Sequence, residues 1–157
     1  MSLLESELEF SLQTRGIKIC FDGKDDCIKN VEDVAKLRSW KPKTLRDFTK
    51  YLDELFKRIE DERVANAMEC KLNNLVSLNY YLSKFGKAPR SSLTKARKLL
   101  KTEVFIGIYD LEAERFDLKH NTYQELHKYL KADKKRIFPR EIAKRSKILK
   151  QFLQFIF

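Results

Sequence analysis

The stretch TLRDFTKYLDELFKRI, residues 44–59, indicates the fold class, because its apolar residues recur every three or four positions. This spacing places them on one face of an α-helix, while charged residues fall on the opposite face. Thr44 is a predicted N-cap, with the acid Asp47 three residues further on. The apolar face comprises Leu45, Phe48, Leu52, Leu55, Phe56 and Ile59.

The same periodicity continues through residues 61–85, where seven apolar residues again recur at steps of three and four. It predicts a helix of about 20 residues or more that ends at Gly86, since glycine is the preferred residue after a helix. The two helices could divide at Glu60-Asp61-Glu62, although no glycine or proline forces a break there. Long helices of this kind pack against each other in antiparallel bundles.

The composition supports a helical protein, because glycine (4) and proline (3) are too scarce for the many tight turns of an all-β fold. We therefore predict a mainly all-α, single-domain bundle of about five to seven helices over residues 1–157. Residues 1–29 would form an N-terminal extension. Within it, residues 3–12 predict a short helix, and the alternating segment GIKICFDG predicts a minor β element near 17–21.

Cap signals place the other helices. Asn30 is the predicted N-cap of a helix to about Trp40, and Ser91 or Ser92 that of a helix whose apolar stripe runs from Leu93 to Leu111. The run 104–109 is also rich in strand formers, so helix and strand both remain open there. A capping box at 122–125 predicts a helix to about residue 130, and Pro139 opens a last helix.

Two segments hold more than the entire net charge of +10. Residues 87–101 carry six lysines and arginines without an acid, and residues 131–150 carry nine against two acids. Such a concentrated basic excess is a candidate surface for a polyanion, and nucleic acid is the commonest biological one. Whether the two segments lie side by side decides whether they act together.

Helical spacing predicts which basic residues of a segment share one helix face. In the second segment, Arg136, Arg140, Lys144 and Lys147 would form a basic ridge on one helix. Arg97 and Arg145 would instead point at apolar stripes and act structurally. Each would either extend its charged end to solvent or pair with a buried acid such as Asp110 or Asp117. The predicted nucleic-acid-binding residues are Lys95, Lys98, Lys101, Lys134, Lys135, Arg136, Arg140, Lys144 and Lys147.

No catalytic, metal or cofactor motif stands out. The pairs Cys20/Cys27 and His120/His127 lack the short spacing of zinc ligands, and no phosphate loop or hydrolase motif occurs. The sequence therefore predicts a protein that is not an enzyme, with no catalytic residues, no metal and no cofactor. No apolar stretch is long enough for a membrane span.

We expect an intracellular α-helical binding module, cytoplasmic or nuclear, that contacts DNA or RNA through its basic surface. The alternative is a protein-interaction or scaffold domain, homodimeric in one version, whose basic face meets an acidic partner. The apolar C-terminus FLQFIF, residues 152–157, favours this alternative if it is exposed.

Overall fold

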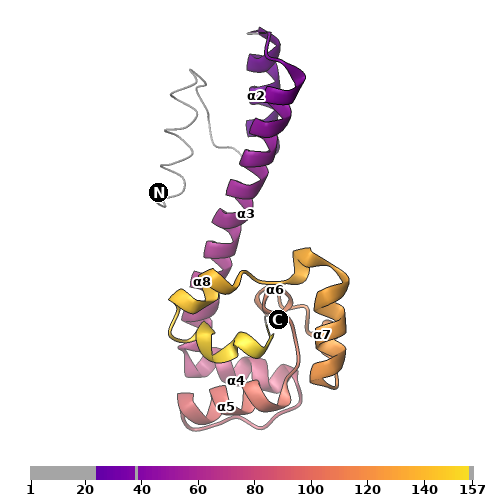
Figure 1. Cartoon of the computed structure of the whole chain (residues 1–157). Helices are drawn as coiled ribbons and strands as arrows, with labels where there is room; N and C mark the ends of the chain where they lie inside the picture. Colours follow the sequence, from indigo (N-terminus) through magenta and orange to yellow (C-terminus); the bar gives the residue numbers. More distant parts are fainter. Residues whose placement is uncertain (1–23, 38, 156–157) are drawn as a thin grey trace. The chain divides into compact units, whose positions relative to one another are not determined.

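The computed structural model describes residues 24–37 and 39–155 (Figure 1). The helix predicted at 3–12 and the β element predicted near 17–21 lie outside these residues. The chain divides into two compact units, residues 1–60 and 61–157, which we call unit 1 and unit 2. Each unit is described by itself, and the single domain expected over 1–157 stays a prediction.

The all-α prediction is confirmed. The described residues form seven α-helices and three short 3-10 helices, and their only β contact is an isolated bridge between Phe105 and His120. The helices of this part of the chain are too short or too polar to cross a membrane.

Unit 1 contains α2 (Lys24–Leu37) and the first part of α3 (Pro42–Leu72). Helix α2 begins before Asn30, so the N-cap predicted there is wrong; α3 begins at Pro42, two residues before the predicted cap Thr44. Proline suits the first turn of a helix because the missing N–H has no partner there anyway. Val31 of α2 packs with Phe48, Leu52 and Leu55 of α3 in a small core.

Helix α3 does not break at residues 60–62. It continues to Leu72, and α4 (Leu75–Lys84) starts after two intervening residues, so the single helix predicted over 61–85 is wrong. The break comes at Asn74, whose side-chain Oδ1 accepts the N–H groups of Val76 at 2.9 Å and Ser77 at 3.1 Å. An asparagine side chain can replace the helical carbonyls in this way, which is why it favours caps over helix interiors.

Helices α4 and α5 (Leu93–Glu103) pack against each other as neighbours. The turn at Gly86 is confirmed: it has φ +69°, and Lys87 N–H donates to the Leu82 carbonyl at 2.8 Å. Ser92, one of the two predicted caps, accepts the N–H of Lys95.

The apolar stripe predicted to continue α5 through Leu111 is divided. Val104 leaves α5 in an extended conformation, and a separate short helix, α6, spans Ile108–Glu112. The competing strand does not form either, since Phe105 makes only the single bridge to His120. Val104, Ile106, Ile108 and Leu111 are nonetheless all buried, so the run enters the core as predicted while changing conformation.

The C-terminal half consists of short elements. After η1 (Phe116–Leu118), the capping box is confirmed at α7 (Tyr123–Ala132), where Thr122 accepts the N–H of Glu125 at 3.2 Å. Then follow η2 (Lys134–Arg136), α8 (Arg140–Arg145) and η3 (Leu149–Phe155). The long last helix expected after Pro139 is therefore wrong, because Ser146 has ψ 125° and ends α8 after six residues.

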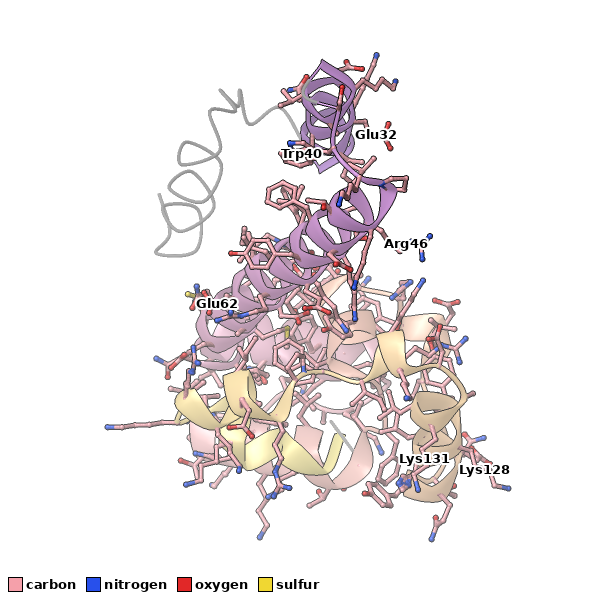
Figure 2. All side chains as sticks on the ribbon, turned by 45° about the horizontal axis from the view of Figure 1, so that its top comes forward. Glu32, Trp40, Arg46, Glu62, Lys128 and Lys131 are labelled. Carbon is pink, nitrogen blue, oxygen red and sulfur yellow. The ribbon has the colours of Figure 1, made fainter. Side chains whose placement is uncertain are left out.

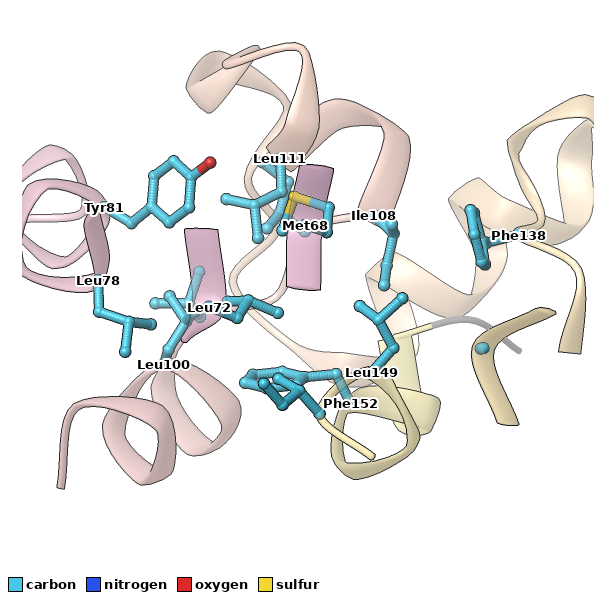
Figure 3. Packing of buried hydrophobic residues seen from close by; sticks show 14 of the residues in the cluster. Met68, Leu72, Leu78, Tyr81, Leu100, Ile108, Leu111, Phe138, Leu149 and Phe152 are labelled. Carbon is cyan, nitrogen blue, oxygen red and sulfur yellow. The ribbon is translucent and has the colours of Figure 1, made fainter. Parts of the chain in front are cut away.

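The core of unit 2 gathers side chains from the end of α3, from α4 to α8 and from η3 (Figure 3). It contains a small apolar pocket of about 20 Å³. Water in such a pocket would find few hydrogen-bond partners. Its lining consists of Met68, Leu72, Leu100, Val104, Ile106, Ile108, Leu111 and Phe152.

Candidate nucleic-acid interface

The basic excess belongs entirely to one unit. Residues 1–60 contain 12 acidic and 12 basic residues, whereas residues 61–157 contain 11 acidic and 21 basic residues. The whole net charge of +10 therefore lies in the sequence of unit 2. An interface for a polyanion is most favourable there, because net charge sets the long-range attraction.

Helix α5 presents the first basic segment. Its inner face buries Ala96, Leu99 and Leu100 against the core. This packing turns Lys95 and Lys98 outward, and both are exposed, while Lys101 is partly buried. The three predicted lysines thus share the outer side of one helix, which is what an interface with a polyanion requires.

Two hollows lie on either side of Lys98. The first has a volume of about 270 Å³ and is lined by Arg90, Lys95, Lys98, Leu99, Thr102 and Glu103. The second has a volume of about 320 Å³ and is lined by Thr94, Arg97, Lys98, Lys101, Gln151 and Phe152. Both combine cations with hydroxyl groups, the side chains that commonly contact phosphate oxygens.

The one acid of the first hollow is engaged elsewhere. Glu103 Oε2 lies 2.6 Å from Lys87 Nζ, so part of its charge is compensated by that ion pair. The backbone of Arg90 is also fixed, because the Asn79 side chain accepts its N–H at 2.8 Å and donates to its carbonyl at 3.0 Å. The first hollow therefore holds its cations on a well-defined support.

Arg97 is structural, although not in the way predicted. Its Nε donates to the Leu72 carbonyl at 2.8 Å and its guanidinium donates to Asn73 Oδ1 at 2.6 Å. It therefore satisfies the end of α3 rather than a buried carboxylate. The buried Asp110 instead pairs with Arg115 at 2.6 Å. Arg145 does pair with an acid, which is Glu62 at 3.5 Å.

The predicted ridge of the second segment does not exist as one helical line. Arg136 belongs to η2, Arg140 and Lys144 to α8, and Lys147 follows the break at Ser146. The ridge assumed a continuous helix, but the chain is extended at Ile137 and Pro139, and Phe138 between them is buried.

Arg136 is occupied within the fold. Its guanidinium lies 4.2 Å from the ring centroid of Tyr129 and donates to the Tyr129 carbonyl at 3.1 Å. Burial raises the pKa of the Tyr129 hydroxyl, and the nearby Asp110 raises it further. Arg136 thus helps to pack α7 against the core, and we remove it from the candidate contacts.

The second hollow joins α5 to the residues that directly follow the second basic segment. Gln151 lines this hollow beside Lys98 and Lys101, and its amide donates to the Lys147 carbonyl at 3.3 Å. The backbone of Lys147 is therefore linked to the hollow through Gln151. Helix α8, which carries Arg140 and Lys144, and the segment after α7, which carries Lys134 and Lys135, lie apart from α5 (Figure 1).

Sequence reasoning missed several lining residues. Thr94 and Thr102 follow the helical spacing of Lys98, so their position on α5 could have been found from periodicity. Gln151 could not, because only the tertiary fold brings η3 to α5. No family model, curated protein or solved structure matches the chain.

Proposed function

We propose that this chain is a non-enzymatic, intracellular binding module that contacts nucleic acid through the outer face of α5 and the adjoining end of the second basic segment. One observation supports the proposal: the two hollows share Lys98, and the second joins α5 to Gln151, whose amide donates to the Lys147 carbonyl. Adjacent phosphates of a nucleic-acid backbone would occupy neighbouring hollows of this kind. Cys70, an exposed free thiol, suits a reducing compartment.

The contact would be mainly electrostatic. If Arg90, Lys95, Lys98 and Lys101 each neutralise one phosphate, the logarithm of the binding constant should fall with the logarithm of salt concentration with a slope of about −3 to −4. Such binding does not read base sequence, because phosphate contacts position a protein without specifying bases. Fluorescence anisotropy of a labelled strand and duplex of about 15 nucleotides, titrated at several salt concentrations, measures this slope.

The deciding variant reverses three charges on α5: Lys95→Glu, Lys98→Glu and Lys101→Glu. We expect affinity at low salt to fall by about 100-fold or more and the salt slope to become shallower, because three phosphate contacts become repulsive. The matched control reverses three exposed lysines of unit 1, Lys41→Glu, Lys43→Glu and Lys57→Glu, and so changes net charge equally.

The control should retain most of the binding. Full-strength binding by the α5 variant, or equal losses in both variants, would contradict an interface on this helix. If polyglutamate binds as tightly as nucleic acid and responds to the same variants, the acidic protein partner replaces nucleic acid as the ligand. Circular dichroism of each variant shows that it is folded.

A further inference from the structure

A second candidate feature lies on α7, where the rings of Tyr123 and His127 stack. Their centroids are 5.8 Å apart and their planes differ by 17°. The two residues are one helical turn apart, so α7 itself sets the spacing. Thr122 caps the helix directly before Tyr123. The pair is therefore held by regular helix geometry rather than by a loop.

The stacked pair shares its face of α7 with Leu126 and Leu130, because positions 123, 126, 127 and 130 follow the i, i+3, i+4, i+7 spacing. Leu126 and Leu130 are buried in the core, whereas Tyr123, in the first turn of the helix, is 39% exposed and His127 is partly buried. A large aromatic side chain in contact with solvent contributes little to folding by burial. Stacking on His127 nevertheless restricts the Tyr123 ring. A ligand that binds to this ring therefore loses little free energy in ordering it.

Cations follow the pair along the same helix. Lys128 and Lys131 are exposed, and Lys131 lies one further turn along from His127 (Figure 2). The nearest acid on the helix, Glu125, accepts the Asn121 N–H at 2.9 Å and so takes part in the capping box. Asp133 accepts the N–H of Lys135 at 2.9 Å. The exposed part of α7 therefore places positive charge one helical turn from the aromatic pair.

Tyr129, on the same helix, provides a contrast. Its ring is already in contact with the Arg136 guanidinium at 4.2 Å and with the His120 ring at 4.8 Å. Tyr129 is a packing residue and is less exposed than Tyr123.

Aromatic residues beside cations fit single-stranded nucleic acid. Its bases present π faces that stack on aromatic rings, while lysines contact the backbone. In a duplex these faces are covered by the neighbouring base pairs, and shape and phosphate contacts dominate recognition. The bridge between Phe105 and His120 also ties the chain after α5 to the chain before α7.

We propose that Tyr123 and His127 form a platform on which one base of a single-stranded nucleic acid stacks, while Lys128 and Lys131 contact the adjoining phosphates. Lys134 and Lys135, which follow α7, extend this basic side. The inference rests on the proposed function and makes it narrower: the ligand is a single strand of RNA or DNA rather than a duplex. Stacking makes the platform tolerant of base sequence.

The test separates stacking from charge. Full-length protein is titrated into a labelled strand of about 15 uridines and into a strand of equal length whose bases are replaced by abasic sites. Both strands carry the same phosphates. We expect the wild type to prefer the strand with bases by about 5-fold or more, and Tyr123→Ala to weaken its binding of that strand by about 5- to 150-fold. A DNA strand and a duplex complete the comparison.

Two matched variants serve as controls. Tyr123→Phe should retain the preference because the ring remains, and Tyr51→Ala should leave binding unchanged, since Tyr51 has a similar 42% exposure but lies in unit 1. Unchanged binding by Tyr123→Ala, equal binding of both strands, or tighter binding of the duplex would overturn the platform and leave the α5 interface standing. Absence of any binding by the wild type would overturn both.

Discussion

The two units use charge differently. In unit 1 acids and bases are equal in number, and its described ion pairs are exposed, as in Asp33–Lys36 at 3.7 Å. Unit 2 holds the surplus of basic residues, and its ion pairs include a buried carboxylate, Asp110, beside Arg115. The difference indicates that the positive charge of this protein is local, since an average surface would mix both signs throughout.

The largest expected difference between the units concerns their cores. Phe138 in unit 2 is 1% exposed and belongs to a large cluster, so Phe138→Ala should lower the free energy of unfolding by ~3–5 kcal/mol. Phe48 is similarly buried, but it belongs to the small core of unit 1, where fewer neighbours surround the lost ring. Phe48→Ala should therefore cost less.

Urea unfolding followed by circular dichroism gives both losses. Trp40, the single tryptophan, lies 5.8 Å from the Phe48 ring, and its fluorescence reports on unit 1. A greater loss for Phe48→Ala than for Phe138→Ala would reverse this ranking of the two cores.

The loss of an ion pair should also cost more stability in unit 2 than in unit 1. Arg115→Ala leaves the buried Asp110 without its guanidinium partner and should cost ~1–3 kcal/mol of unfolding free energy. Lys36→Ala removes an exposed pair in unit 1 and should cost less than ~0.5 kcal/mol. Thermal or urea unfolding measures both, and equal costs would show that burial of the carboxylate does not distinguish these pairs.

The smallest effect concerns single charges within the second basic segment. Lys147→Glu should weaken binding of a labelled strand several-fold more than Lys144→Glu, because Lys147 lies four residues before Gln151, which lines the hollow beside Lys98, whereas Lys144 belongs to α8. Both substitutions change net charge equally, so each is the control for the other. Equal losses would indicate that Lys144 also contacts the strand, as the ridge predicted from the sequence requires.

Sequence reasoning succeeded where a signal is local. Ser92, Thr122 and Gly86 lie at the ends of their helices because capping depends on the residue itself and its immediate neighbours. The apolar periodicity likewise identified most core positions of α3, α4 and α5. Those features fixed the fold class and placed Lys95 and Lys98 on an outer face.

It failed in two kinds of place. The apolar pattern is continuous across residues 73–74 and concealed the local cap signal of Asn74, after which α4 begins. Arg97 from α5 also donates to the Leu72 carbonyl and to the Asn73 side chain at the end of α3. The ridge from Arg136 to Lys147 has helical spacing, but burial of Phe138 and the break at Ser146 interrupt it. Gln151 joins the candidate interface only through tertiary packing, for which the sequence contains no local signal.

Phe152 lies at the boundary between the core of unit 2 and the candidate interface. Its side chain lines both the small apolar pocket of the core and the basic hollow beside Lys101. It therefore separates an apolar pocket from a hollow that a hydrated anion could enter. A change in the position of this ring would alter the volumes of the pocket and of the hollow together. Binding of an anion in the hollow and packing of the core are therefore coupled through Phe152.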